Sequence, residues 1–318
     1  MNMREMIESF NTQIVEGWNS ARTLELGHGI VDYVNVIGMG GSALPGDFLR
    51  AYSDKIYVNV FRDYELPALP QGGLNICISY SGNTEETVSV FERLVDKKLP
   101  CVAIASGGTL LDLARVHSVP HIELRKDLVP RLALPLISSA LLSVCERARL
   151  LNVREDEIIE ASKKLNPQET SELGKNLSNL FYMRIPLFYA SARNEIIAKV
   201  GKISLNENAK TQAFYNIIPE MNHNEMNGFE VLNGQFSGIF VYDNDDHPQN
   251  IKRMKLTQQI LADHGVPTID IKLPEENRLL KLVYAIQLFN WASFYLANRY
   301  NVDPVSVPVV EKFKKQLG

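Results

Sequence analysis

The sequence has little cysteine, little tryptophan and no excess of positive charge. Its three cysteines, Cys77, Cys101 and Cys145, lie in apolar runs and lack the spacing of metal ligands. Free cysteine is among the most often buried residue types, so we expect buried, reduced thiols in a reducing compartment. The net charge of −4 argues against a nucleic-acid-binding surface.

Long apolar runs are also missing. The longest stretch that we find, Leu132 to Cys145, contains Pro135 and several serines and is shorter than the roughly 20 residues of a membrane-spanning helix. The N-terminal residues do not show the basic-then-apolar pattern of a signal peptide. We therefore expect a soluble, cytoplasmic protein that contacts no membrane.

Short apolar runs alternate with helical patterns along the chain. This alternation predicts parallel sheets that are covered by helices on both faces. The expected strands are 33–37, 56–60, 75–79, 102–105, 121–124, 185–189, 236–242 and 268–271. The expected helices are 3–24, 46–52, 85–96, 249–264, 278–300 and 307–317.

The chain length and a polar interruption predict two domains. With 318 residues, the chain exceeds the roughly 250–300 residues at which one core stops growing. A polar helical stretch covers 149–170, and the alternation of strands and helices begins again after it. We predict two α/β domains of three layers each, flavodoxin-like with mostly parallel sheets, over residues 1–152 and 153–318.

A glycine-rich motif, Gly38-Met39-Gly40-Gly41-Ser42, follows the first expected strand. Glycine accepts positive φ angles and lets backbone N–H groups approach a ligand closely. The motif lacks the third glycine and the downstream acidic residue of a dinucleotide fingerprint, and no Gly-Lys-Ser/Thr of a Walker loop follows. Taken alone, it is explained equally well by a tight strand-to-helix turn.

A hydroxyl-rich motif, Ser79-Tyr80-Ser81-Gly82-Asn83-Thr84-Glu85-Glu86-Thr87, lies where another strand gives way to a helix. Free N–H groups and the positive end of the helix dipole make such a position suitable for a phosphate monoester. The alternative is local capping, with Asn83 and Glu86 as a capping box. A cap needs one oxygen, whereas Ser79, Ser81 and Thr84 offer three hydroxyls, so phosphate binding is favoured.

These two motifs together resemble the sugar-isomerase (SIS) domain family, and the whole chain is similar to the bifunctional phosphoglucose/phosphomannose isomerases. The resemblance implies tandem SIS domains and an aldose–ketose isomerase that acts on a phosphorylated hexose. Its substrates would be glucose 6-phosphate and fructose 6-phosphate, with mannose 6-phosphate in addition. The resemblance also implies that the sugar site is lined by Gly40, Gly41 and Ser42, and that the phosphate is held by Ser79, Ser81 and Thr84.

An arginine, Arg131, precedes the apolar run L-A-L-P. From the sequence alone, a surface arginine whose aliphatic stem covers apolar residues is the favoured interpretation. The resemblance reverses this, because the family has an arginine at this place that faces the reacting carbons. A guanidinium there would stabilise the negative charge on an enediolate oxygen.

Two further motifs, S-L-N-E-N-A-K with Glu207 and P-E-M-N-H-N-E with His223, supply acid–base candidates. Isomerisation through a cis-enediol needs one carboxylate to move a proton between C1 and C2, and another group to open the ring. The resemblance implies that Glu207 and His223 take these roles. As isolated residues, a solvated glutamate and a structural histidine are the commoner interpretations. A metal site of His223, Glu225 and Asp243 matches no known ligand spacing, and the enediol route requires neither metal nor cofactor.

The C-terminal segment contains Asp303-Pro304-Val305-Ser306 and, further on, Lys312. The resemblance implies that Lys312 reaches the active site. Some family members have threonine directly after Asp-Pro, near substrate C2, where this chain has Val305, and this difference bears on the mannose activity. The resemblance further implies a homodimer with shared active sites, in which His223 comes from the neighbouring subunit. We expect each site to lie between the domains, at the carboxyl ends of the strands.

Three alternative functions are weighed against this interpretation. An amino-sugar isomerase of the glucosamine-synthase kind would normally carry an N-terminal glutaminase with a nucleophilic cysteine, and Met1-Asn2-Met3 offers none. A sugar-phosphate-sensing regulator would place a helix-turn-helix domain before the first strand, where too few residues stand. A sugar-phosphate-binding SIS protein without activity is disfavoured by the presence of Glu207 and His223.

Overall fold

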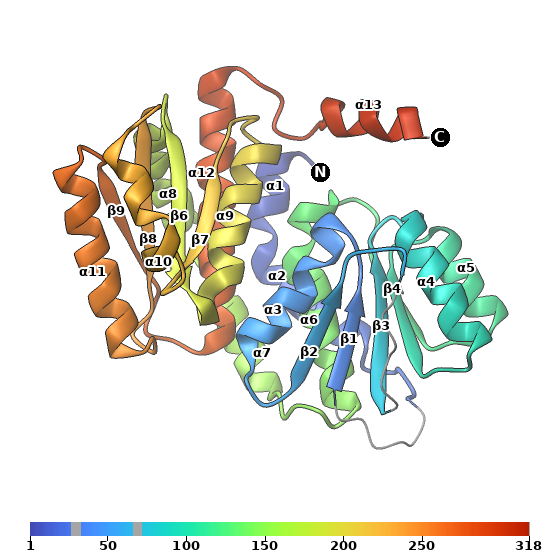
Figure 1. The fold of residues 1–318 in the computed structure, drawn as a ribbon. Coiled ribbons are helices and arrows are strands. Elements are labelled where there is room, and N and C mark those ends of the chain that lie inside the picture. The colour runs from blue at the N-terminus through green and yellow to red at the C-terminus, as the bar shows by residue number, and fades with distance from the viewer. Residues whose placement is uncertain (27–32, 66–71, 318) are drawn as a thin grey trace. The chain divides into compact units, whose positions relative to one another are not determined.

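The computed structural model describes residues 1–26, 33–65 and 72–317, and these divide into two units (Figure 1). The first unit comprises Met1, Glu8–Leu165 and Asn277–Leu279, and the second comprises Asn2–Ile7, Asn166–Glu276 and Leu280–Gly318. Each unit contains one parallel sheet. The two-sheet α/β class expected from the sequence is confirmed.

The first unit holds a sheet with the strand order β2-β1-β3-β4-β5. From β1 the chain goes to β2 on one side of β1 and then to β3 on its other side. The direction in which strands are added to the sheet therefore reverses between β1 and β3. In open α/β sheets, such a reversal creates a crevice at the carboxyl ends of the two strands where ligands bind. The strands are β1 (Tyr33–Ile37), β2 (Tyr57–Phe61), β3 (Gly73–Ser79), β4 (Cys101–Ala105) and β5 (His121–Glu123).

The core of the first unit is built around two helices and the central strand β3, all seven residues of which are buried. Helix α2 packs against α6 at Gly17, where an added Cβ would lie 2.1 Å from the Leu136 backbone oxygen. The helical elements are α2 (Phe10–Ser20), η1 (Gly40–Ser42), α3 (Leu44–Tyr52), α4 (Glu85–Asp96), α5 (Gly108–Val116), η2 (Pro130–Leu132), α6 (Leu134–Arg147) and α7 (Glu155–Lys164).

The second unit holds a sheet with the order β7-β6-β8-β9, again parallel throughout. Its strands are β6 (Ile185–Ser191), β7 (Phe214–Ile218), β8 (Phe236–Tyr242) and β9 (Thr268–Lys272). The helical elements are α1 (Met3–Glu8), α8 (Pro167–Phe181), η3 (Ala192–Asn194), α9 (Glu195–Glu207), α10 (Met221–Asn224), η4 (Met226–Glu230), α11 (Pro248–Asp263), α12 (Arg278–Tyr300) and α13 (Pro308–Leu317).

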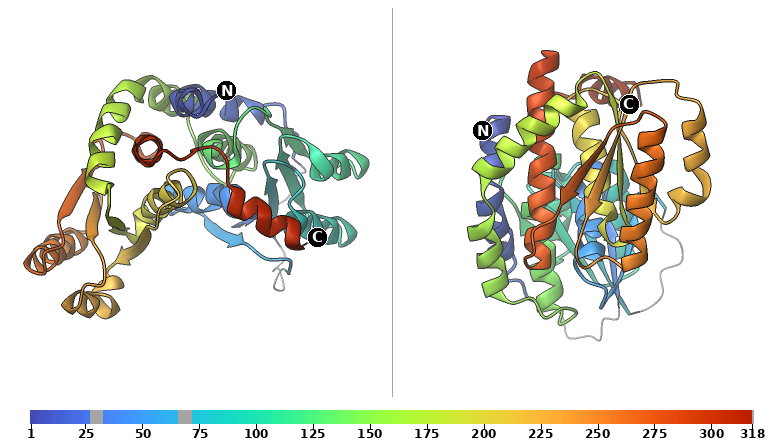
Figure 2. Two further views of the ribbon diagram at one scale, coloured as in Figure 1. Left: turned by 90° about the horizontal axis from the view of Figure 1, so that it is seen from above. Right: turned by 90° about the vertical axis from the view of Figure 1, so that its left-hand side faces the viewer.

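Helix α12 is the core helix of the second unit (Figure 2). It is long and apolar enough to span a membrane by length and composition, but 83% of the relevant window is buried inside the protein. Its polar side chains bind neighbouring elements: Thr170 Oγ1 of α8 donates to Gln287 Oε1 at 2.7 Å, and Gln287 Nε2 donates to the Ile7 carbonyl of α1 at 2.8 Å. The apolar character of α12 is therefore explained by packing within the unit.

Some element boundaries differ from those expected. The first helix is broken at Ser9 and ends at Ser20. Strand β7 is missing from the sequence prediction, because it is a short edge strand whose first residue, Phe214, is 55% exposed. Helix α7 belongs to the first unit, where Ser162 Oγ donates to the Asn11 carbonyl at 2.8 Å. The domain division between residues 152 and 153 stays a prediction.

All three cysteines are buried free thiols, as expected. Burial raises the pKa of Cys101 to about 11 and that of Cys145 to about 12. The thiolate is the reactive form of cysteine, so these side chains stay protonated near neutral pH and serve in packing.

Candidate active site

The two predicted binding motifs of the first unit meet at the carboxyl ends of β1 and β3. Ser42, in η1, is buried, and its Oγ accepts a hydrogen bond from the Tyr80 amide at 3.0 Å. Gly40 has a φ of +52°, in the region that L-residues with side chains rarely adopt. Ser42 thus joins the glycine-rich loop to the hydroxyl-rich loop at the sheet's crevice.

Ser79 organises the hydroxyl-rich loop from within. Its side chain is fully buried, and its Oγ accepts hydrogen bonds from the amides of Gly82 at 3.1 Å and Thr84 at 3.3 Å. The same oxygen lies 2.8 Å from Thr84 Oγ1. Ser81 is exposed and Thr84 is half-buried. The hydroxyls of this loop therefore divide into an interior one that shapes the turn and outer ones that can face a ligand.

Asn83 does not form the capping box considered from the sequence. Its Oδ1 instead accepts hydrogen bonds from the Thr109 amide at 3.0 Å and the Thr109 hydroxyl at 3.2 Å, in the first turn of α5. The N-cap residue of α4 is Thr84, and its side chain makes no capping hydrogen bond. The capping-box alternative is thus wrong. The first turn of α4 keeps the geometry that suits an anion.

Arg131 is buried rather than spread over the surface, with 8% of the residue exposed. It lies in η2 beside the glycine-rich loop: an added Cβ on Gly41 would be 3.2 Å from the Arg131 backbone nitrogen. The interpretation of Arg131 as a surface arginine whose stem covers apolar residues is therefore wrong. The close approach of the two backbones depends on Gly41 and places Arg131 next to the loop that was predicted to line the sugar site.

Tyr80 is a structural member of the site that sequence reasoning missed. Its hydroxyl donates to the Arg125 carbonyl at 2.6 Å and accepts from the Leu128 amide at 3.2 Å. Ser106 Oγ donates to the Tyr80 carbonyl at 2.6 Å. Tyr80 thus ties the hydroxyl-rich loop to the segment that leads into Arg131. In the sequence, Tyr80 stands between two serines at the end of a strand. An aromatic residue there looks like one more residue of the strand, so the role of its hydroxyl was not recognised.

In the second unit, Glu207 is the last residue of α9, and its surroundings are firmly held. Asn208 is fully buried, and its Nδ2 donates to Ser293 Oγ of α12 at 2.9 Å. Asn206 Nδ2 donates to the Thr211 carbonyl at 2.8 Å. Lys210 Nζ donates to the Glu207 carbonyl at 2.6 Å, where a cation also complements the negative end of the helix dipole. The half-buried Glu207 is therefore placed by a fixed backbone.

The Asp303–Ser306 turn carries Val305 and lies near the end of α9. Asp303 accepts hydrogen bonds from the amides of Val305 at 2.9 Å and Ser306 at 3.2 Å. These hydrogen bonds, and to a smaller extent the charge of Lys210, lower the pKa of Asp303. Two motifs far apart in the sequence, those of Glu207 and Val305, are thus neighbours through Lys210.

His223 lies in α10, exposed, beyond the carboxyl end of β7. Helix α9 leads from the carboxyl end of β6 to the amino end of the parallel strand β7, so its last residue, Glu207, lies toward the amino edge of the sheet. The two residues are separated by the length of β7, five residues or about 16 Å at the usual rise. Glu207 and His223 are thus placed toward opposite edges of the second sheet.

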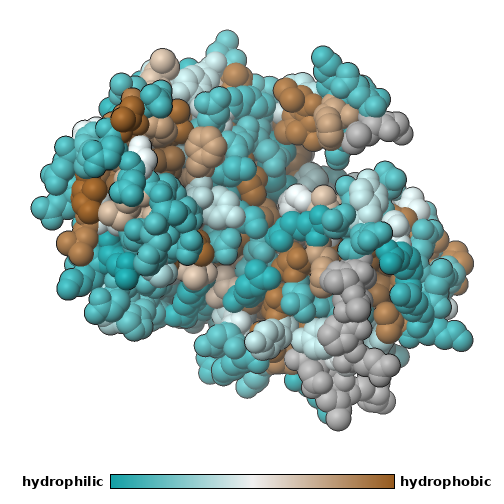
Figure 3. All heavy atoms as spheres, in the orientation of Figure 1, coloured by the Kyte–Doolittle hydropathy of each residue, from teal (hydrophilic) through white to brown (hydrophobic). Residues whose placement is uncertain are grey.

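Lys312 lies in α13, where it is exposed. Apolar residues of the same helix are exposed as well, Val309 by 81% and Phe313 by 60%, and Figure 3 shows hydrophobic spheres over this helix. The structure thus places Lys312 on an amphipathic helix at the surface of its unit.

The carboxyl edge of the second sheet is occupied by a buried ion-pair cluster. Lys281 Nζ donates to Asp243 Oδ1 at 2.6 Å and to Asp245 Oδ2 at 2.7 Å. Burial lowers the pKa of Lys281, but the hydrogen bonds to Asp243 and Asp245 and the charges of both carboxylates together outweigh this effect, so the net pKa is raised. The loop after β8 has the position in the second sheet that the hydroxyl-rich loop has after β3 in the first sheet. It carries acidic side chains, which would repel a phosphate.

Replacing Lys281 with methionine should destabilise the protein by about 3–5 kcal/mol, because it leaves the Asp243 carboxylate buried without its cation. The matched control is Lys164→Met, which removes the exposed partner of Glu160 at 2.8 Å and should cost no more than about 1 kcal/mol. Urea unfolding followed by circular dichroism measures both. Equal effects of the two substitutions would show that the Lys281 cluster does not stabilise the second unit.

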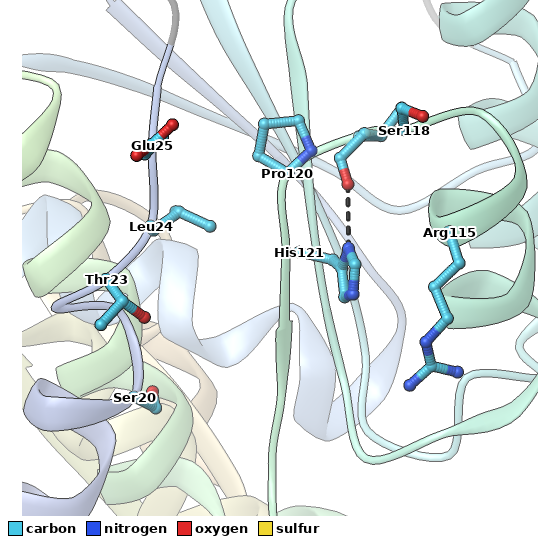
Figure 4. A pocket seen from close by; sticks show the side chains of 9 residues that line it. Ser20, Thr23, Leu24, Glu25, Arg115, Ser118, Pro120 and His121 are labelled. Carbon is cyan, nitrogen blue, oxygen red and sulfur yellow. Dashed lines mark hydrogen bonds between the residues drawn. The ribbon is translucent and has the colours of Figure 1, made fainter.

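A pocket of about 510 Å³ lies at the opposite, amino edge of the first sheet (Figure 4). Two of the side chains that line it have partners in the first unit: Arg115 pairs with Glu123 at 2.7 Å, and His121 Nδ1 lies 2.9 Å from the Val119 carbonyl. None of the predicted site residues lines it. Within residues 1–26, 33–65 and 72–317, no group of three His, Cys, Asp or Glu residues is arranged to hold a metal ion.

Comparison with known proteins identifies relatives along almost the whole chain. Residues 170–317 match the bacterial phospho-glucose isomerase C-terminal SIS domain. A bifunctional phosphoglucose/phosphomannose isomerase of Aquifex aeolicus is 33% identical over 96% of this chain and 97% of its own. Another, from Caldicellulosiruptor bescii, is 34% identical over 91% and 90%. Among solved structures, the C-terminal domain of glucosamine-fructose-6-phosphate aminotransferase from Francisella tularensis has a TM-score of 0.75, with 14% identity over 95% of this chain and 97% of that one.

Proposed function

Because the chain belongs to the bifunctional phosphoglucose/phosphomannose isomerase family, we propose that it interconverts glucose 6-phosphate, fructose 6-phosphate and mannose 6-phosphate. The family relationship supports the reaction. One observation carries the location of the site. The glycine-rich loop, the hydroxyl-rich loop and buried Arg131 converge at the carboxyl ends of β1 and β3.

The phosphate is bound at the N-terminus of α4. Ser81 and Thr84 supply hydroxyl donors, and the first-turn amides of α4 supply N–H groups and the positive end of the helix dipole. Ser79 shapes this loop through its two amide contacts. Lys312 adds a positive charge from α13. These contacts lie away from the reacting carbons, so their binding energy positions C1 and C2 for the reaction.

The reaction then moves one proton along the open-chain sugar. His223 opens the ring. The Glu207 carboxylate takes the C2 proton of the aldose, the C2–H electron pair forms the C1=C2 bond, and the aldehyde oxygen becomes a hydroxyl or enediolate oxygen. Arg131 stabilises the negative charge on that oxygen, beside Gly40, Gly41 and Ser42. The C2 hydroxyl proton passes to the oxygen on C1, and Glu207 returns its proton to C1 as the C2=O bond forms, which gives the ketose.

The active form is a cytoplasmic homodimer with shared sites. Glu207 and His223 lie toward opposite edges of one sheet, and their separation along β7 exceeds the size of the carbon chain on which they act. This separation supports a site in which a second copy of the chain supplies His223. Closed two-fold dimers create two such shared sites by symmetry.

The test is an assay of the purified protein in EDTA with fructose 6-phosphate as substrate. Glucose 6-phosphate and mannose 6-phosphate are measured separately by coupled enzymes. We expect both products to form, and the reaction to tolerate the chelator. Formation of neither product would reject the proposed function.

Replacing Val305 with threonine should raise the proportion of mannose 6-phosphate by about two- to tenfold, as expected for one added hydrogen bond. The substitution keeps the shape of the side chain, and the Asp303 contacts use backbone amides, so the turn should persist. Val305→Ala is the control because it changes the same position without adding a hydroxyl. If both variants give the same proportion of mannose 6-phosphate, Val305 does not lie near C2 of the substrate.

A further inference from the structure

The segment that carries His223 is anchored to the second sheet through Glu225. Glu225 Oε1 accepts a hydrogen bond from the Tyr189 hydroxyl of β6 at 2.5 Å, and Oε2 accepts one from Asn216 Nδ2 of β7 at 2.6 Å. Each carboxylate oxygen thus has a donor on a different strand. Two such contacts fix the orientation of the carboxylate as well as its position.

Tyr189 is suited to act as a permanent donor. Its side chain is fully buried, and burial first, then the charge of Glu225, raises its pKa far above the ordinary value. The phenol therefore keeps its proton. Ionised carboxylates accept shorter and stronger hydrogen bonds than neutral groups do, so the Tyr189 contact holds Glu225 tightly.

The backbone transmits this anchor to His223. The Glu225 amide donates to the Met221 carbonyl at 2.9 Å, and the Gly228 amide donates to the Glu225 carbonyl at 2.9 Å. Met221 is fully buried on the other side of His223. The exposed His223 therefore lies on a short turn that is held at both ends, two residues from a carboxylate bound to the sheet.

We propose that Tyr189, Glu225 and Asn216 are positioning residues that hold the His223 imidazole in place for opening the sugar ring. The inference rests on the proposed function, because it concerns the ring-opening step of that reaction. Glu225 is half-buried, so its carboxylate has lost part of its hydration, and apolar residues of similar size would stabilise the fold about as well. The cluster is thus better explained by accurate placement of His223 than by stability.

The test separates ring opening from proton transfer. Opening and reclosing the ring exchanges the α and β anomers of glucose 6-phosphate without breaking the C2–H bond. Magnetisation exchange between the two anomers, measured by NMR on the full-length protein, reports this step alone. We expect the wild-type protein and Glu207→Gln to exchange the anomers, and Tyr189→Phe to exchange them about ten- to a hundredfold more slowly, as misplaced catalytic groups do.

The matched control is Tyr242→Phe. Tyr242 lies on the neighbouring strand β8, and its hydroxyl donates to Gln258 Oε1 of α11 at 2.5 Å rather than to Glu225. We expect near-normal anomer exchange from this variant. Equal losses in Tyr242→Phe and Tyr189→Phe would mean that both hydroxyls only stabilise the sheet, and would overturn the proposal.

A rescue experiment covers the case in which Tyr189→Phe folds poorly. Glu225→Gln should lose anomer exchange, because its amide group meets the donor Nδ2 of Asn216. Adding Asn216→Asp restores a donor–acceptor pair and should recover the exchange. Failure of this recovery in a folded protein, or normal exchange in Tyr189→Phe, overturns the positioning role. If the wild-type protein does not catalyse isomerisation, the proposed function is rejected. If it catalyses isomerisation but not anomer exchange, the ring-opening role of His223 is rejected.

Discussion

Glu207→Gln is expected to lower kcat for fructose 6-phosphate by about 10²- to 10⁴-fold, the usual contribution of a general base. The amide keeps the size of the side chain but cannot accept the C1 proton of the ketose. Its KM should change little, because in the proposed site the phosphate is bound by Ser81 and Thr84 rather than by Glu207. Steady-state kinetics measure both constants, and loss of hydrogen exchange between substrate and deuterated solvent identifies the missing step.

The control for this substitution is Glu195→Gln, at the first residue of the same helix. Glu195 accepts a hydrogen bond from the Tyr215 hydroxyl at 3.3 Å, and it lies at the other end of α9 from Glu207. We expect turnover close to that of the wild type. If Glu207→Gln itself keeps near-normal turnover, Glu207 is not the base.

Mixing two inactive variants, Glu207→Gln and His223→Ala, is expected to restore activity. In a two-fold dimer with shared sites, the mixed dimer has one doubly substituted site and one intact site. Random pairing of equal amounts makes half of the dimers mixed, so the mixture should reach about a quarter of the wild-type specific activity. Each homodimer alone retains only its own residual rate, which serves as the baseline.

The experiment uses co-expression with two different affinity tags, so that the mixed dimer can be isolated and assayed by itself. The control is a pair of the Glu207→Gln variant under both tags, which should stay inactive. Activity of the mixed dimer no higher than the mean of the two homodimers would mean that each chain builds its own site. The separation of Glu207 and His223 along β7 would then have to be bridged by a rearrangement within one chain.

The α/β class and most elements were predictable from the sequence, because they depend on local chemistry. Strands β1, β3 and β8 are short segments in which most residues are apolar, and this composition is typical of buried parallel strands. The loops after β1 and β3 were recognisable because glycine and hydroxyl residues are concentrated where each strand ends. Strand β7 was missed because it is a short edge strand whose first residue, Phe214, is exposed.

Which partners the loop residues choose could not be predicted. Asn83 and Glu86 have the spacing of a capping box, yet the Asn83 side chain binds Thr109 of the next helix. In the sequence, Glu225 was considered as a metal ligand, yet its two carboxylate oxygens accept hydrogen bonds from Tyr189 and Asn216. Thr109 is 26 residues from Asn83 and Tyr189 is 36 residues from Glu225, so no local pattern encodes these contacts.

The sequence by itself determined the residue types that the chemistry needs: a hydroxyl-rich turn at a helix N-terminus, a glycine loop, an arginine, a glutamate and a histidine. Only the tertiary structure decided that Arg131 is buried beside Gly41 and that Glu207 and His223 lie toward opposite edges of one sheet. The physical reason is that a helix between two parallel strands runs back along the sheet, so its last residue is carried away from the edge where the strands end.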